Sequence, residues 1–106
     1  MDIRKPTLCI DERIARENIR MMAAKAARQS VLFRPHFKTH QSVEVGKWYR
    51  QVGVTAITVS SVSMARQFAD AGWDDITIAF PVNIRETEEV CALAARIKLN
   101  VLFDSP

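Results

Sequence analysis

The chain has 106 residues, of which 48% are hydrophobic and 25% are charged, so its composition is that of one small globular domain. This composition excludes a disordered tail and a collagen-like chain, and no apolar run approaches the ~20 residues needed to cross a bilayer. The first residues, MDIRKP, lack the apolar stretch of a secretory signal, so we expect a cytoplasmic protein with no membrane partner. The net charge of +3 is dispersed along the chain, and nucleic-acid binding is therefore a minor alternative.

The predicted elements alternate along the chain. Helical periodicity predicts a first helix from Asp11, as its N-cap, to about Gln29, and three later helices. The second ends at Gly53, the third ends at Gly72, and the fourth opens with Asn83 and Glu86 in capping-box spacing. Short β-branched or aromatic runs predict four buried strands, at residues 31–33, 54–59, 76–80 and 99–103. The two cysteines, Cys9 and Cys91, are far apart and are predicted to be reduced, buried and inert.

Alternation of strands and helices predicts an α/β fold with a parallel sheet. Four strands at this spacing amount to about half of a (β/α) barrel. A flavodoxin-like open sheet is the competing architecture, but no Gly-rich phosphate loop follows any strand. Because the sequence stops directly after a predicted strand, we expect a fragment of a longer protein.

One segment contains side chains that could take part in catalysis. It is Arg34-Pro35-His36-Phe37-Lys38-Thr39-His40. If residues 31–38 form a strand, alternation places Arg34, His36 and Lys38 on one face, inside the barrel. Adjacent cationic groups in such a place repel one another and favour the neutral, nucleophilic amine of Lys38. An amine of this kind forms a Schiff base with an aldehyde cofactor, and catalytic groups of parallel barrels lie at the carboxyl ends of strands.

Other interpretations of this segment stay open at this point. A lysine and two histidines near a strand end are often a solvated loop. His36 and His40 have a spacing that suits zinc on a helix, but the segment is predicted to be strand and turn, without a nearby acidic or cysteine ligand. A Cys-His nucleophile is disfavoured by the apolar settings of both cysteines.

The heptapeptide resembles the lysine motif of the D-threonine aldolase and D-serine dehydratase group, which are pyridoxal-phosphate enzymes with an N-terminal barrel like that of alanine racemase. The resemblance extends to Pro6-Thr7-Leu8, to Thr58-Val59-Ser60-Ser61 and to the segment from Asp74 to Pro81. It implies that residues 1–106 are the N-terminal part of this barrel, with the rest of the barrel and a C-terminal β domain missing. The chain departs from the family at Gln41, where lysine is frequent, and at Met64, where an acidic residue is frequent.

The resemblance implies that Lys38 holds pyridoxal 5'-phosphate covalently, with His36 and Arg34 as cofactor neighbours and His40 either orienting the loop or reaching the substrate pocket. It implies a lyase, homodimeric at full length, that cleaves or dehydrates D-β-hydroxy amino acids. Phosphate-binding loops and a divalent-metal site would lie outside this chain. Thr39 and His40 differ from alanine racemase, so racemisation is the runner-up chemistry. The alternative from another class is a catalytically incomplete fragment or an α/β binding domain that assembles with a partner through its open edges.

Overall fold

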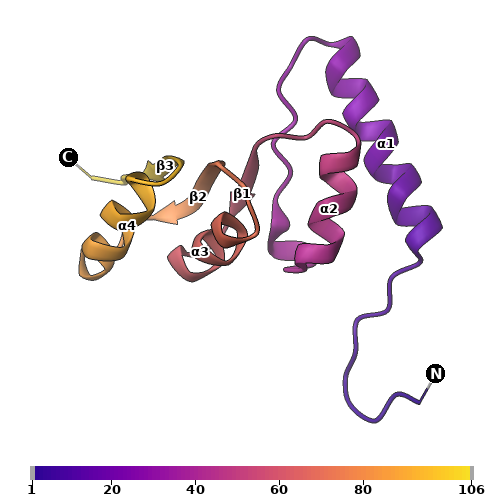
Figure 1. Ribbon diagram of the computed structural model, residues 1–106, viewed down its shortest axis with the longest axis horizontal. Coiled ribbons are helices and arrows are strands. Elements are labelled where there is room, and N and C mark those ends of the chain that lie inside the picture. Colours follow the sequence, from indigo (N-terminus) through magenta and orange to yellow (C-terminus); the bar gives the residue numbers. More distant parts are fainter. Residues whose placement is uncertain (1, 106) are drawn as a thin grey trace.

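A computed structural model describes residues 2–105, in which helices alternate with parallel strands (Figure 1). In chain order the elements are α1 (Glu12–Arg28), η1 (Phe37–Thr39), α2 (Val43–Gln51), β1 (Ile57–Val59), α3 (Val62–Asp70), β2 (Asp75–Pro81), η2 (Ile84–Glu86), α4 (Thr87–Ala94) and β3 (Lys98–Leu102). In this part of the chain, no helix has both the length and the apolar character needed to cross a membrane.

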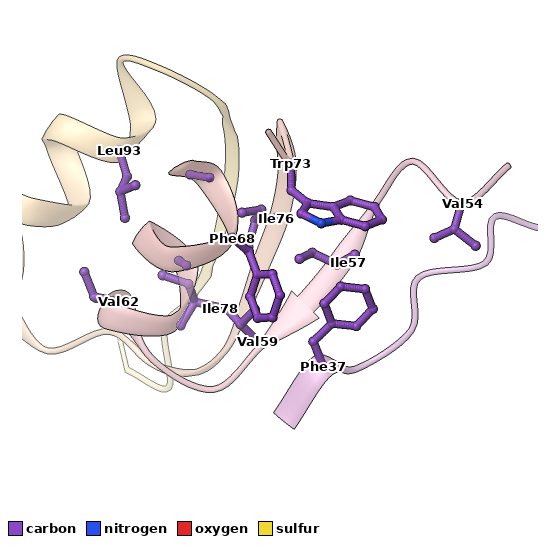
Figure 2. Packing of buried hydrophobic residues seen from close by; sticks show 12 residues of the cluster. Phe37, Val54, Ile57, Val59, Val62, Phe68, Trp73, Ile76, Ile78 and Leu93 are labelled. Carbon is purple, nitrogen blue, oxygen red and sulfur yellow. The ribbon is translucent and has the colours of Figure 1, made fainter. Parts of the chain in front are cut away.

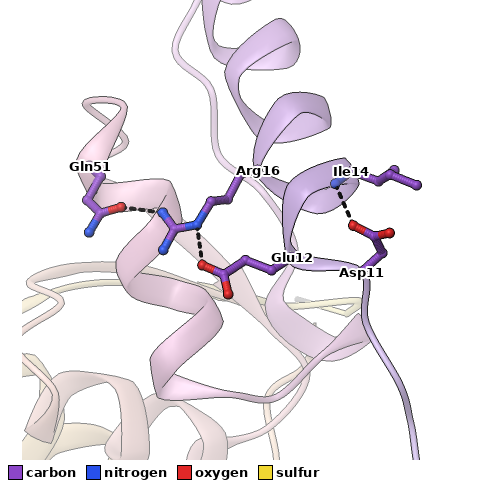
Figure 3. Close-up of polar contacts among 5 residues, drawn as sticks. All are labelled: Asp11, Glu12, Ile14, Arg16 and Gln51. Atoms are coloured by element: carbon purple, nitrogen blue, oxygen red, sulfur yellow. Dashed lines mark hydrogen bonds and ion pairs between the residues drawn. The ribbon is translucent and has the colours of Figure 1, made fainter.

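The helix ends follow the predicted signals in three of four cases. Asp11 caps α1, because its Oδ1 accepts a hydrogen bond from the backbone N–H of Ile14 at 3.0 Å (Figure 3). Gly53 and Gly72 follow α2 and α3 with φ of +88° and +93°, a left-handed conformation in which other residues are strained. These boundaries are therefore set by local backbone chemistry.

The predicted capping box of the last helix is wrong. The Asn83 side chain accepts from the backbone N–H of Arg85 and caps the short 3₁₀ helix η2. α4 begins only at Thr87, and the Glu86 at its N-cap makes no side-chain capping bond. The spacing of Asn83 and Glu86 fits two successive turns as well as one helix start, and the chain adopts the 3₁₀ turn first.

The sheet has the order β1-β2-β3 with all strands parallel. Ile57 pairs with Ile76, and Ile76 pairs with Leu99. The strand predicted at residues 31–33 is absent, and this segment reaches the sheet only through an isolated parallel bridge between His36 and Thr58. Pro35 has no N–H to donate to a ladder, which limits pairing at this edge. The lysine-bearing segment therefore lies beside β1 without forming a regular strand.

The hydrophobic core lies between one face of the sheet and the helices (Figure 2). Ile57, Val59, Ile76 and Ile78 alternate along β1 and β2 and are at most 5% exposed. The opposite face carries polar side chains, and Asn100 Nδ2 there donates to Thr77 Oγ1 across neighbouring strands at 3.1 Å. The sheet thus separates an apolar helical layer from a polar face.

One arginine of the first helix contacts two residues of α2. Arg16 donates to Glu12 on its own helix at 2.8 Å and to Gln51 Oε1 of α2 at 2.6 Å (Figure 3). Its guanidinium also lies 4.8 Å from the centre of the Trp48 ring. Along α1 only Ile19 is buried, at 6% exposed, and Met22 is 49% exposed.

Both cysteines differ from their prediction. Cys9 and Cys91 are free thiols, as expected, but both are exposed. Cys9 lies in the extended segment before α1, and Cys91 lies on the outer side of α4, which buries Leu93 instead. Periodicity alone does not fix which side of a short helix faces the core.

Candidate active site

The Lys38 turn lies just past the point where its segment pairs with the sheet. His36 bridges Thr58 of β1, and Phe37, Lys38 and Thr39 then form the 3₁₀ turn η1. The backbone N–H of Lys38 donates to His36 Nδ1 at 3.2 Å. Because the neighbouring strands are parallel, this turn lies at their carboxyl-end edge, where parallel α/β folds place their functional groups.

The burial of this segment follows the predicted alternation although the strand does not form. Pro35 and Phe37 are buried, Arg34 and His36 are half-buried, and Lys38 is exposed. Within residues 2–105, the Lys38 amine makes no ion pair and no side-chain hydrogen bond, whereas Lys47 and Lys98 each pair with a carboxylate. The lysine singled out by the sequence therefore has a free, accessible amine on a turn anchored by a buried aromatic ring.

The predicted cluster of mutually repelling cations is wrong, because Arg34 is neutralised. Its Nη1 lies 2.7 Å from Asp75 Oδ1 at the start of β2 and donates to the backbone oxygen of Ile57 at 3.3 Å. The first contact is a close ion pair in which Asp75 Oδ1 accepts no well-aligned hydrogen bond. The close contact with the Arg34 guanidinium and its positive charge lower the pKa of Asp75, with a smaller contribution from Lys98 at 3.5 Å. Only Lys38 keeps an uncompensated charge in this segment.

His36 is held in a neutral form. Burial lowers its pKa first, and the nearby charge of Lys38 lowers it further. Its Nδ1 accepts from the Lys38 backbone, so Nε2 carries the proton of the neutral ring. His36 thus acts on the backbone of the lysine turn, and its Nε2–H remains a donor for a bound group.

His40 lies among aromatic rings behind the turn. Its ring centre is 4.6 Å from that of Phe37 and 5.9 Å from that of Tyr49, nearly parallel to the latter. Its Nδ1 accepts from the backbone N–H of Ser42, the N-cap of α2, at 3.0 Å. These contacts are those of a residue that orients the loop and the helix start, one of the two roles expected from the sequence. A contact with substrate stays a prediction.

We expect the stability of the chain to fall as the pH is lowered from 7.5 to 5.5. Burial lowers the pKa of His40, so the unfolded chain binds more protons than the folded chain below pH 6.5. Protonation of Nδ1 would also place an N–H against the N–H of Ser42. Thermal unfolding at several pH values checks this, with a shallower pH dependence expected for His40→Asn. An equal slope in that variant would contradict the role of His40 and point to His36, whose pKa is lowered as well.

Two glutamines hold the far side of the lysine turn. Gln41 has a φ of +52°, its Nε2 donates to the Lys38 carbonyl at 3.3 Å, and its own carbonyl accepts from Gln67 Nε2 of α3 at 3.2 Å. The turn is therefore tied to α3 as well as to the sheet. Sequence reasoning noted Gln41 only as a departure from the family and missed Gln67, for which an exposed helix position gives no signal.

A pocket of about 220 Å³ opens at the same edge, past the ends of β1 and β2. Its polar lining comes from Ser60, Ser61, Asn83 and Glu86, and its walls are apolar side chains of β2, β3, α3 and α4. Among the described residues, no group of three or more histidine, cysteine or acidic side chains could hold a metal ion. The structure therefore gives no support to zinc at His36 and His40.

Sequence reasoning also missed Asp75 as a partner for the heptapeptide. Asp75 is the first residue of β2. Because Ile76 and Ile78 point into the core and side chains alternate along a strand, Asp75 lies on the polar face of the sheet. An acidic residue on the face predicted for Arg34 was a usable signal. The register that brings the two side chains together, however, is fixed only by strand pairing.

Comparison with known proteins identifies the fold and then the group. No family model matches the chain. In solved structures, it superposes on D-threonine aldolase from Filomicrobium marinum with a TM-score of 0.89 and 28% identity, covering 96% of this chain and 28% of that one. An alanine racemase-like protein from Idiomarina loihiensis gives a TM-score of 0.78 at 27% identity, covering 91% of this chain and 26% of that one. The fold is thus part of an alanine-racemase-like barrel, and not a flavodoxin-like sheet.

Two curated relatives are dehydratases from the same group of enzymes. The chain is 35% identical to the D-threo-3-hydroxyaspartate dehydratase of Delftia sp. (strain HT23) over 101 residues, 94% of this chain and 27% of the relative. It is 29% identical to the D-serine dehydratase of Dictyostelium discoideum over 110 residues, 98% of this chain and 28% of the relative. The chain is therefore a homologue of the D-threonine aldolase and D-serine dehydratase group, as its heptapeptide suggested. It spans about a quarter of the length of these curated relatives.

Proposed function

We propose that the chain is the N-terminal part of a pyridoxal-phosphate-dependent lyase that acts on D-β-hydroxy amino acids. The observation that supports this most directly is the free amine of Lys38, which lies on a turn at the carboxyl-end edge of the sheet. The chain that carries this turn is similar to two D-hydroxy amino acid dehydratases and to a D-threonine aldolase. The chain fits one requirement of the cofactor, an accessible amine for its aldehyde. The groups that bind its phosphate would lie in the remainder of the protein.

The residues of this chain would bind the cofactor and move a proton. Lys38 would hold the cofactor at its aldehyde group through Nζ, and in a dehydration the same amine would take the α-proton on one face of the substrate. Pyridoxal phosphate supplies an electron sink for the carbanion at Cα. His36 donates through Nε2–H to a neighbouring acceptor, while Thr39 and His40 shape the entrance beside the lysine. We retain racemisation as the runner-up chemistry.

The wider properties of the full-length protein are part of this proposal. We propose a cytoplasmic homodimer with a divalent metal bound by residues outside this chain. A variant of the Delftia dehydratase described as being in a metal-free form supports the metal. We propose no nucleic-acid partner, because several arginines of the described segment already pair with nearby carboxylates.

The second candidate function is an inactive assembly unit, which two observations favour. The polar face of β1, β2 and β3 and the short coverage of the relatives suit a piece that needs further strands to complete its barrel. Gel filtration of the isolated chain separates an incomplete barrel from a self-contained α/β binding domain, because open edges favour self-association whereas a self-contained domain runs as a monomer.

An assay of the full-length protein with D-threo-3-hydroxyaspartate, D-serine and D-threonine tests the main proposal. Dehydration, followed by hydrolysis of the product, releases ammonia and a keto acid, whereas retro-aldol cleavage of D-threonine releases glycine and an aldehyde. Either pair of products in a cofactor-dependent reaction is the expected result. Inversion at Cα alone, such as formation of L-serine from D-serine, would instead establish racemisation, and no turnover of any of the three would overturn the proposed lyase.

A further inference from the structure

We propose that Arg34 is a positioning residue, which fixes the Lys38 turn to the sheet through Asp75 and the Ile57 carbonyl. This inference rests on the proposed function of Lys38. It departs from the expectation that Arg34 contacts the cofactor, because its guanidinium is already engaged at the opposite, amino-terminal end of the strands. Ile57 and Asp75 are the first residues of β1 and β2.

The segment before Lys38 needs such an anchor because its backbone is held weakly. Within the described chain, residues 31–36 make one backbone hydrogen bond to the sheet, from Thr58 N to the Pro35 carbonyl at 2.9 Å. Arg34 extends this attachment past β1 to β2, with Nη1 at 2.7 Å from Asp75 and 3.3 Å from the Ile57 oxygen. Contacts with two neighbouring strands restrict both sliding and rotation of the segment.

The electrostatic setting of this pair differs from that of the surface pairs. The side chains of Arg34 and Asp75 are only 22% and 21% exposed, so solvent screens them weakly. Arg34 and Lys98 lower the pKa of Asp75, so its carboxylate keeps its charge to a lower pH than an isolated aspartate does. Arg96 and Asp70 also lie 2.7 Å apart, but they are 50% and 59% exposed and join the turn after α4 to the end of α3, away from the lysine turn. That pair provides a matched control.

The experiment compares Asp75→Asn, Arg34→Lys and the control Arg96→Ala in the 106-residue chain and in the full-length protein. Hydrogen exchange of residues 34–41 reports the anchoring in the absence of cofactor. The rate and pH profile of borohydride-trapped pyridoxal phosphate on Lys38 report the position and environment of the amine. Circular dichroism and thermal unfolding show which variants fold.

In Asp75→Asn we expect faster exchange of residues 34–41 and trapping at Lys38 that is about 10- to 100-fold slower, since small misplacements of a reacting group have effects of this size. Arg34→Lys keeps the positive charge and is expected to retain more of the trapping rate than Asp75→Asn does. Arg96→Ala should match the wild type. If Asp75→Asn does not fold, Arg34→Lys decides the question through the same two measurements.

Wild-type exchange together with a wild-type rate and pH profile of trapping in a folded variant would overturn the positioning role. Failure of the proposed function looks different, because Lys38 would then give no adduct even in the wild-type full-length protein. In that case the exchange of residues 34–41 still shows whether the Arg34 anchor exists.

Discussion

Replacing Lys38 with alanine is expected to abolish covalent attachment of pyridoxal phosphate to the full-length protein. The amine of Lys38 is exposed and, among residues 2–105, free of any carboxylate partner, and its turn lies at the carboxyl-end edge of the sheet. Mass spectrometry after incubation with cofactor and borohydride measures the effect. We expect one reduced adduct that maps to Lys38 in the wild type and only background labelling in the variant.

Lys47→Ala is the matched control for this substitution. Lys47 is also exposed and lies on α2, but its Nζ pairs with Glu44. The control should keep the adduct at Lys38, because simple surface labelling would affect both lysines alike. A specific adduct that persists in Lys38→Ala would contradict the proposed site, and it would have to be mapped to another amine.

Phe37→Ala is expected to have the largest effect on stability, lowering the free energy of unfolding by about 3–5 kcal/mol. Phe37 is fully buried and lies next to the lysine in the sequence. Its ring centre is 4.9 Å from that of Phe68 and 5.3 Å from that of Trp73, in edge-to-face contacts (Figure 2). A loss of this size is a large fraction of the 5–15 kcal/mol typical of small domains. Urea denaturation measures it.

Truncating an exposed phenylalanine is the control, because it removes the same ring without opening a cavity in the core. Phe103 is 73% exposed, so Phe103→Ala should change the stability of the isolated chain by no more than about 0.5 kcal/mol. Equal losses in the two variants would mean that Phe37 is not a central part of the core. The lysine motif would then be held by its polar contacts alone.

Local patterns predicted much of the fold because they reflect short-range chemistry. The N-cap at Asp11 and the turns at Gly53 and Gly72 depend on a few neighbouring residues, and the structure confirms them. The alternation around Phe37 predicted which side chains are buried, although Pro35 prevented a regular strand. The exposed positions of Cys9 and Cys91 could not be predicted, since they depend on how elements pack against one another.

The sequence by itself determined the alternation of helices and parallel strands, the lysine heptapeptide at the end of a buried segment, and the family resemblance of that heptapeptide. Tertiary structure decided which groups surround that lysine. Arg34 meets Asp75 across 41 positions of sequence because parallel pairing of β1 and β2 brings their first residues to one end of the sheet. Gln67 reaches the turn because α3 packs beside it. Contacts of this kind depend on strand register and helix packing, which no local pattern encodes.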